Sequence, residues 1–306
     1  MMKDDKEDTP DMKPRAGPLY SPGGDNHLVI YYAQETDLVA TMMTHAYMRA
    51  ILEAKIPGVT EVTNAEASLM VHFDPMRIRY EDLLKEIQVI EEAWTDPEQW
   101  ASDSNLFEIP VWFNDPWSME CYLTHKELHP LKDGSLSNFE YCAEYVGFST
   151  EELIERLVNV QYFIFNVGFA PGIQGLFPLV ERGDILQFPK YEVSRPWSPP
   201  RVLCGGGDNF SIHPYVLPGG LQMLGSTPVP MTSLEPAEKV LPALQGKLTL
   251  ATLGDRFELR STSKKEYEEI RAEVVAGTYD YKVTAQKWEP KKWIDDPKSY
   301  RGTHFA

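Results

Sequence analysis

The alternation of apolar and polar positions predicts regular elements in the N-terminal part of the chain. The expected order is strand, helix, strand, strand, helix and strand, over residues 27–32, 38–51, 59–63, 68–73, 80–94 and 107–113. The pair Thr36-Asp37 is a helix N-cap signal, and Pro57-Gly58 predicts the end of the first helix. This order is that of a ferredoxin-like split βαβ unit.

The pattern changes after residue 114. Two helical patterns follow a loop-like stretch, and the second is opened by Ser149 with Glu152 three residues later, a capping box. From Tyr162 onward, short β-prone runs alternate with Gly and Pro clusters, which is typical of a barrel or sandwich. Gly254-Asp255 predicts a hairpin within residues 247–261.

We therefore place the main domain boundary near residue 160. Residues 263–306 look peripheral, although packing of Trp288 and Trp293 on the protein's own barrel is favoured over docking on a partner. The predicted division is a disordered tail (1–25), an N-terminal α/β domain (26–135), a helical connector (136–160), a β-barrel domain (161–262) and a C-terminal extension (263–306).

Composition narrows the class of protein. Apolar residues make up 42% and charged residues 25% of the 306 residues, as in a globular protein. A net charge of −17 repels phosphate backbones and anionic membranes, so we expect no nucleic-acid or membrane partner. The start of the chain has no signal-peptide pattern, and we expect a cytoplasmic protein. Three cysteines at long spacings indicate neither a disulfide framework nor a zinc site.

Three glycine-rich clusters carry the strongest chemical signal, over residues 168–172, 205–214 and 218–228. Glycine lets backbone N–H groups face a ligand, an arrangement used for oxyanions and carboxylates. The alternative is that Gly and Pro only form tight corners of a barrel. No Walker A motif occurs, and no G-x-G-x-x-G opens a helix after a strand, so phosphate binding of those kinds is not supported.

These clusters resemble the carboxyltransferase subunit 1 (allophanate hydrolase subunit 1) family. Gly168-Phe169-Ala170-Pro171-Gly172, the triple glycine before Ile212-His213-Pro214, and Pro218-Gly219-Gly220 carry the resemblance. Further matches are Pro57-Gly58-Val59, Val71-His72-Phe73-Asp74-Pro75 and Gly254-Asp255-Arg256. The family includes the first half of the urea carboxylase carboxyltransferase domain, a 5-oxoprolinase subunit and a sporulation kinase inhibitor.

The resemblance implies an α+β protein, in which a ferredoxin-like α/β domain precedes a cyclophilin-like β-barrel. It also implies that the barrel pairs with a homologous barrel, carboxyltransferase subunit 2, to complete the site. Partner subunits would use ATP and, in urea carboxylase, biotin, so no cofactor is expected on this chain alone. It would then be inactive by itself in a carboxylase or hydrolase complex.

Several residues depart from the family pattern. His213 stands where the family has Tyr, and Ser226 where it has Arg. The family's Arg-rich stretch is only loosely kept, as Lys190, Arg195 and Arg201. Losing an arginine removes a bidentate partner for a substrate carboxylate, so the substrate differs from that of the usual members.

His213, Asp208 and Asn209 are the candidate catalytic residues, because His213 titrates near neutrality and the other two can orient an amide or carbonyl. The alternatives are a barrel-wall histidine and two turn-capping residues. The candidate substrate-binding residues are Gly172, Gln174, Arg195, Gly205, Gly206, Gly207, Pro218, Gly219, Gly220 and Gln222. We expect no metal site, since His125 and His129 lack a third ligand nearby.

Three functions remain open. The first is a subunit of an ATP-dependent carboxylase or amide or lactam hydrolase, acting on a small amide, urea or ketone. The second is a subunit of a biotin-independent ketone carboxylase of the acetophenone carboxylase type, with hydantoinase-like partner subunits. The third is a non-catalytic regulator that inhibits a histidine kinase.

Overall fold

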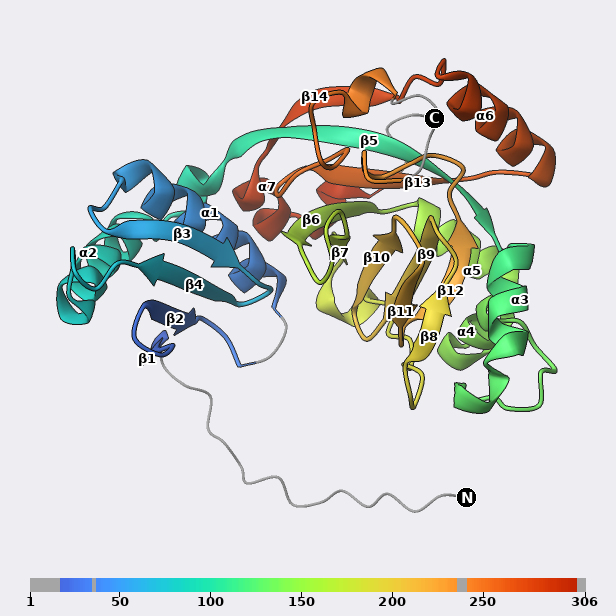
Figure 1. Cartoon of the computed structure of the whole chain (residues 1–306), viewed down its shortest axis with the longest axis horizontal. Coiled ribbons are helices and arrows are strands. Elements are labelled where there is room, and N and C mark those ends of the chain that lie inside the picture. Colours follow the sequence, from blue (N-terminus) through green and yellow to red (C-terminus); the bar gives the residue numbers. More distant parts are fainter. Residues whose placement is uncertain (1–16, 35–36, 236–240, 302–306) are drawn as a thin grey trace. The chain divides into compact units, whose positions relative to one another are not determined.

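The computed structural model of this chain describes residues 17–34, 37–235 and 241–301 (Figure 1). The chain forms two compact units, residues 1–99 and 100–306. The first strand, β1 (Leu19–Pro22), lies inside the stretch that was expected to be a disordered tail. It is ordered because it pairs with β2 (His27–Tyr31) and because the Tyr20 hydroxyl donates to Glu91. The rest of the expected tail, residues 1–16, lies outside the described residues.

The N-terminal unit is a four-stranded antiparallel sheet with two helices. The sheet order is β1-β2-β4-β3, and α1 packs against β3, β4 and α2. Asp37 caps α1 as predicted, since its side chain accepts a hydrogen bond from the Ala40 N–H at 2.7 Å. The remaining elements of this unit are α1 (Leu38–Ala54), β3 (Val59–Asn64), β4 (Ser68–Phe73) and α2 (Tyr80–Ala93).

The strand order of this unit is that of a ferredoxin-like sheet, but its edge strand is not the predicted one. The strand expected at 107–113 is part of β5 (Ser102–Phe113), which belongs to the second unit. It pairs there with β13 (Arg256–Ser261), about 150 residues away in sequence, a partner that no local pattern identifies. In the N-terminal sheet, β1 occupies the edge position beside β2 that was expected for the strand at 107–113. The two units therefore divide after Gln99, whereas the sequence pattern placed the boundary near residue 160.

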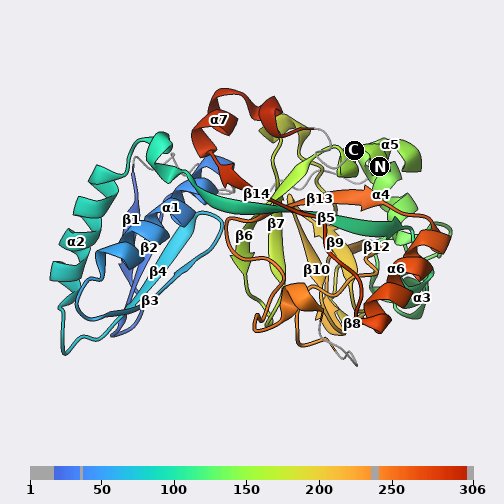
Figure 2. The ribbon, with the colours of Figure 1, turned by 90° about the horizontal axis from the view of Figure 1, so that it is seen from above.

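The second unit is built on a closed seven-stranded barrel. Its strands follow the order β12-β9-β10-β7-β6-β13-β5, and pairing of β12 with β5 closes the ring. β14 (Val283–Trp288) extends β5 outside the ring, and Figures 1 and 2 show β14, β5 and β13 side by side. The other strands of the ring are β6 (Gln161–Val167), β7 (Gln174–Pro178), β9 (Val202–Gly206), β10 (Asn209–His213) and β12 (Gln222–Ser226).

Helices and a small second sheet cover the barrel. α3 (Pro116–Thr124) and α4 (Asn138–Val146) contact β12, and α5 (Thr150–Val158) contacts β13. The predicted capping box of α5, Ser149 with Glu152, is present. β8 (Arg195–Ser198) and β11 (Leu217–Gly219) form the second sheet. Short 3-10 helices lie at Pro97–Trp100, Lys126–Leu128, Arg182–Asp184, Pro242–Leu244 and Pro297–Tyr300.

One apolar core joins the barrel interior to the helices that were expected to be a connector. Phe210 and Ile212 of β10 are buried in it together with Phe139 of α4 and Leu153 and Leu157 of α5. The segment 136–160 therefore packs as part of the barrel unit. Burial of apolar surface on this scale is the main force that holds the unit together.

The C-terminal part is integral rather than peripheral. Trp288 is fully buried beside Phe163 of β6, and Trp293 is also buried, as expected for packing on the protein's own barrel. The predicted hairpin over 247–261 does not form, because only Arg256–Ser261 is a strand and its partners are β5 and β6. The helices of this part are α6 (Lys264–Ala276) and α7 (Pro290–Asp295).

Candidate functional site

The barrel has two ends that the strand registers define. Neighbouring strands in this part of the barrel are antiparallel, so their ends alternate. One end of the barrel is formed by the last residues of β6, β10 and β12 and the first residues of β7 and β9. We call it the Arg201 end, after the residue that precedes β9, and we call the opposite end the Gly207 end, after the turn between β9 and β10.

The predicted site residues divide between these two ends. Gln174 pairs with Ile212, next to His213, at the Arg201 end, and Gly172 lies in the loop that leads to Gln174. Asp208 and Asn209 lie at the Gly207 end, in or beside the β9–β10 turn. At about 3.3 Å per residue, Asn209 and His213 are about 13 Å apart along β10. The three candidate catalytic residues are therefore not brought together in one place.

Apolar side chains cover the triple glycine. A Cβ on Gly205 would lie 2.9 Å from Phe188 Cδ2, and a Cβ on Gly206 would lie 2.5 Å from Leu221 Cδ2. Gly207 has a φ of 64°, a conformation that glycine adopts without strain. In this structure the glycines therefore give room to packed side chains and a tight turn, and a role in ligand binding stays a prediction.

Gly172 and Gln174 are close-packed at the Arg201 end. Gly172 has a φ of 89°, and a Cβ at this position would lie 2.9 Å from Thr232 Cβ. Gln174 is fully buried, its Nε2 donates to the Ala251 carbonyl at 3.4 Å, and its Oε1 has no partner among the described residues. A buried amide oxygen without a partner is uncommon in a folded protein. Any ligand group that bonds to this acceptor would have to enter a site that is closed in this structure.

His213 and Arg195 are brought together under the small second sheet. A Cβ on Gly219 would lie 3.0 Å from His213 Cε1 and 3.5 Å from an Arg195 terminal nitrogen, so the glycine allows both side chains to approach. Burial, followed by the Arg195 charge, lowers the pKa of His213 to about 4. His213 is therefore neutral at pH 7 and, contrary to the expectation from the sequence, does not titrate near neutrality. Its Nδ1 has no partner in the part of the chain described here.

Arg195 is a fully buried cation with polar rather than acidic neighbours. Its two terminal nitrogens donate to the Leu221 carbonyl at 2.8 Å and to the Ser198 hydroxyl at 3.0 Å. Its guanidinium carbon lies 4.1 Å from the centre of the Tyr191 ring, a cation–π contact that favours the charged form. Through the bond to the Leu221 carbonyl, Arg195 connects β8 to the residue that precedes β12 of the barrel.

Gln222 belongs to a buried polar network. Its Oε1 accepts from Asn138 Nδ2 at 2.8 Å and contacts His129 Nε2 at 2.9 Å, while its Nε2 donates to the Pro189 carbonyl at 2.9 Å. The Leu131 N–H contacts His129 Nδ1 at 2.9 Å, which places the His129 proton on Nε2. Sequence reasoning missed His129 and Asn138 as partners of Gln222, because they are 93 and 84 residues away and no spacing pattern links them.

The remaining predicted residues, Pro218 and Gly220, lie in or beside β11. The Gly220 carbonyl accepts from the Tyr191 N–H at 2.8 Å, and a Cβ on Gly220 would lie 3.2 Å from the Ser194 hydroxyl. Gly220 therefore packs closely against the start of β8, and Pro218 lies in the strand that pairs with β8.

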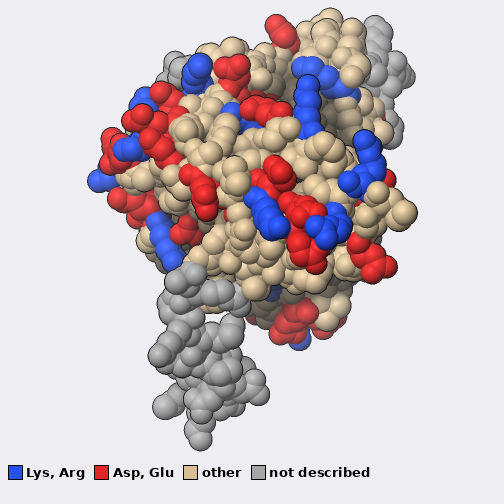
Figure 3. Space-filling view, turned by 90° about the vertical axis from the view of Figure 1, so that its left-hand side faces the viewer, with Lys and Arg blue, Asp and Glu red and all other residues tan. Residues whose placement is uncertain are grey.

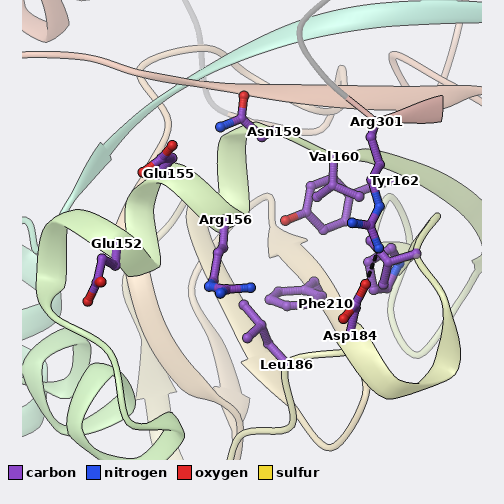
Figure 4. Close-up of a pocket in the computed structure, with 12 residues that line it drawn as sticks. Glu152, Glu155, Arg156, Asn159, Val160, Tyr162, Asp184, Leu186, Phe210 and Arg301 are labelled. Atoms are coloured by element: carbon purple, nitrogen blue, oxygen red, sulfur yellow. Dashed lines mark hydrogen bonds and ion pairs between the residues drawn. The ribbon is translucent and has the colours of Figure 1, made fainter. Parts of the chain in front are cut away.

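A cavity of about 450 Å³ opens at the Gly207 end (Figure 4). Phe210 lies in the centre of the view, and Arg156 and Arg301 lie on either side of it. Arg301 is paired with Asp184. The other groups that line the cavity are Glu152, Glu155, Asn159, Val160, Tyr162, Pro178, Val180 and Leu186.

Three further features of the described residues bear on possible ligands and partners. On the face drawn in Figure 3, acidic and basic side chains are interspersed, so no surface of one sign faces the viewer. Within the described ranges, no group of three or more His, Cys, Asp or Glu side chains is placed to hold a metal ion. In the same ranges, no helix is long and apolar enough to cross a membrane.

Residues 18–241 match the profile of the carboxyltransferase domain, subdomain C and D. The chain is 23% identical over 283 residues to urea amidolyase of Lachancea kluyveri, covering 90% of this chain but only 15% of that protein. It is 26% identical over 259 residues to a 5-oxoprolinase subunit of Bacillus subtilis, covering 82% of this chain and 95% of that protein. The fold matches the crystal structure of Kluyveromyces lactis urea carboxylase with a TM-score of 0.75 at 19% identity, over 95% of this chain and 27% of that one.

Proposed function

This chain belongs to the family of the carboxyltransferase domain, subdomain C and D, and we propose that it is one subunit of a multi-subunit ATP-dependent carboxylase or amide or lactam hydrolase. In this proposal its barrel supplies half of a substrate pocket. The observation that carries the proposal is the family match over residues 18–241, most of a chain that folds into a closed seven-stranded barrel and an antiparallel sheet.

The lengths of the relatives support an activity that belongs to an assembly. The match to the 5-oxoprolinase subunit covers 95% of that protein, whereas the match to urea amidolyase covers 15%. The same stretch of sequence is thus nearly a whole subunit in one relative and a small part of a long chain in the other. We expect such a stretch to work through contacts with other chains or domains. The activity itself would then require those contacts.

The partner in this proposal is a chain with a homologous barrel, of the carboxyltransferase subunit 2 kind. Hydantoinase-like carboxylase subunits are the partners if the substrate is a ketone. ATP is used on the partner subunits, and so is biotin if the complex is biotin-dependent. The small-molecule substrate lies between the two halves.

The site residues support polar recognition of the carbonyl or amide part of a substrate. His213 is neutral at pH 7 and its Nδ1 has no partner among the described residues, so it is suited to accept a proton or a hydrogen bond once a substrate reaches it. At the same end of the barrel, the buried Oε1 of Gln174 also lacks a partner within the described ranges. An amide N–H is the complementary group for both acceptors.

Purification of the tagged chain from its native host, followed by identification of co-purifying proteins and reconstitution, tests the proposal. We expect a chain with a homologous barrel, and ATP hydrolysis that depends on an added amide, lactam, urea or ketone. A histidine kinase as sole partner, with no ATP-dependent turnover by the complex, would contradict the proposal. A biotin-bearing partner would exclude the ketone carboxylase variant.

Exchange of His213 for Ala tests the predicted role of that residue. We expect turnover by the reconstituted complex to fall by about 10²-fold or more, the usual range for loss of a general acid or base. His213→Gln, which keeps a polar side chain of similar size, serves as the matched variant for packing. Unchanged turnover in His213→Ala would remove this residue from the mechanism.

A further inference from the structure

Arg201 holds an unusual backbone conformation at the end of the barrel that carries His213. Its φ is 61°, in the left-handed region that residues with a Cβ rarely adopt. The Arg201 N–H donates to the His213 carbonyl at 2.6 Å, and the Arg201 carbonyl accepts from the Thr227 N–H at 2.9 Å. The ends of β10 and β12 therefore fix the position of this residue. Backbone strain that is held in this way clusters at functional sites.

The Arg201 side chain is only partly neutralised. One terminal nitrogen lies 3.3 Å from Glu235 Oε2, and the Glu235 side chain is only 5% exposed. The other Glu235 oxygen accepts from the Met231 N–H at 2.8 Å. Arg201 Nε is buried and has no partner among the described residues. The Arg201 side chain as a whole is 21% exposed, so part of it can be reached from solvent.

A second guanidinium reaches the same place from α6. One Arg271 terminal nitrogen donates to the Pro228 carbonyl at 2.8 Å, two residues after the end of β12. Arg201 is bonded to Thr227 and Arg271 to the next residue, Pro228, so the two arginines reach neighbouring positions of the chain. Burial and then the Arg201 charge lower the pKa of Arg271. Arg271 lies beyond residues 18–241, so the family match does not account for it.

The charges of this cluster do not cancel. The Arg201 guanidinium pairs with the one described carboxylate, of Glu235, while the Arg271 guanidinium has the Pro228 carbonyl as its printed hydrogen-bond partner. The cavity at the Gly207 end has the opposite balance, since Arg156 and Arg301 share its lining with three carboxylates. An excess of positive charge is notable in a chain of net charge −17. Because like charges repel, a cluster of this kind is stabilised when an anion binds to it.

We propose that Arg201 and Arg271 bind a small carboxylate-type anion, a carboxyl group of the substrate or bicarbonate, at the Arg201 end of the barrel. A planar O–C–O group fits the planar edge of a guanidinium in a bidentate contact. This inference rests on the proposed function, in which a carbonyl or carboxyl group reacts.

The test measures acetate binding to the full chain by isothermal titration calorimetry at constant ionic strength, with chloride as the balancing anion. The variants are Arg271→Gln and Arg201→Gln, and Arg156→Gln at the other barrel end is the matched control. Circular dichroism confirms that each variant is folded. We expect saturable acetate binding by the wild type and by Arg156→Gln, and binding at least about 10-fold weaker in Arg271→Gln.

Equal acetate binding by Arg271→Gln and the wild type would overturn the proposal, and so would an equal loss in Arg156→Gln. Saturable binding of inorganic phosphate without binding of acetate would also overturn it, because the class of anion would be wrong. If Arg201→Gln does not fold, Arg271→Gln alone decides the outcome. The measurement needs no partner chain, so its result is independent of whether the protein belongs to an ATP-dependent complex.

Discussion

The two ends of the barrel contain similar side chains in opposite electrostatic settings. At the Gly207 end, Arg301 pairs with Asp184, and further carboxylates line a cavity of about 450 Å³. At the Arg201 end, Arg201 pairs with the single described carboxylate, of Glu235, Arg271 adds a second cation, and the backbone of Arg201 is held in a left-handed conformation. The cavity and the proposed site therefore lie at opposite ends of the barrel. Unbalanced charge and backbone strain point instead to the end that also carries His213.

The first prediction concerns the C-terminal segment from β14 to Arg301, whose last residue lines the cavity at the Gly207 end. Trp288 is fully buried against Phe163 and Tyr300. Trp288→Ala should lower the free energy of unfolding of the second unit by about 3–5 kcal/mol, as large-to-small changes of buried aromatic residues do. Urea unfolding measures the change. Trp117→Ala, at a residue that is 40% exposed, is the control and should cost much less. Similar costs for both variants would contradict the integral packing of this segment.

The second prediction separates the two arginines by their surroundings. Arg201→Gln leaves the buried Glu235 carboxylate without its ion-pair partner and should destabilise the protein by about 1–3 kcal/mol at pH 8. Arg301→Gln removes a partly exposed pair and should cost less than about 1 kcal/mol. Urea unfolding of both variants checks the difference. Equal costs would mean that the ion pairs at the two ends are alike.

The same experiment has a pH dependence. Burial raises the pKa of Glu235 to about 7. The hydrogen bond from the Met231 N–H and the charges of Arg201 and Arg271 oppose this shift. Tyr281 is a further titratable group near this carboxyl. Because the folded pKa exceeds the unfolded value of about 4.3, the folded state binds more protons between these values. The contribution of Glu235 to stability is therefore complete below about pH 4 and is lost as the pH rises through 7. The cost of Arg201→Gln should accordingly shrink between pH 8 and pH 5.5, and a larger cost at pH 5.5 would refute this account of the pair.

The third prediction compares one glycine from each end. Gly172 and Gly207 both have positive φ values, of 89° and 64°. A Cβ on Gly172 would also lie 2.9 Å from Thr232 Cβ, whereas a Cβ on Gly207 would meet only Lys190 Cε at 3.9 Å. Gly207→Ala should therefore cost about 1 kcal/mol and Gly172→Ala about 2 kcal/mol or more. Thermal unfolding of both variants measures their losses of stability. A larger loss in Gly207→Ala than in Gly172→Ala would show that the Arg201 end is less tightly packed than the Gly207 end.

Local signals predicted much of the fold. Asp37 and the Ser149–Glu152 capping box mark helix starts that the structure confirms, because a cap depends on residues a few positions apart. The partner of the strand at 107–113 was not predictable in this way. Its parallel pairing with β13 depends on residues about 150 positions away, and the same apolar pattern would suit the edge of either sheet.

The site was less predictable than the fold. The Gly205–Gly207 run indicated an exposed backbone, but the density of glycine cannot show that Phe188 and Leu221 fill the space beside it. Gln222 was selected from its position in a β-run, while its partners His129 and Asn138 lie in distant segments. Arg271 lies in a charged helix that resembles an ordinary solvated surface, and only the folded structure brings it to Pro228. Side-chain contacts between residues far apart in the sequence therefore could not be predicted from the sequence.

The most direct test of the difference between the two ends is the turnover of the reconstituted complex with a single arginine exchanged at each end. Arg201→Gln should lower ATP-dependent turnover by about 10-fold or more, since a charge that holds a reacting carboxyl group is lost. Arg156→Gln, at the Gly207 end, should leave turnover within about 2-fold of the wild type. Full activity in Arg201→Gln together with loss of activity in Arg156→Gln would contradict the account and would make the cavity at the Gly207 end the working site.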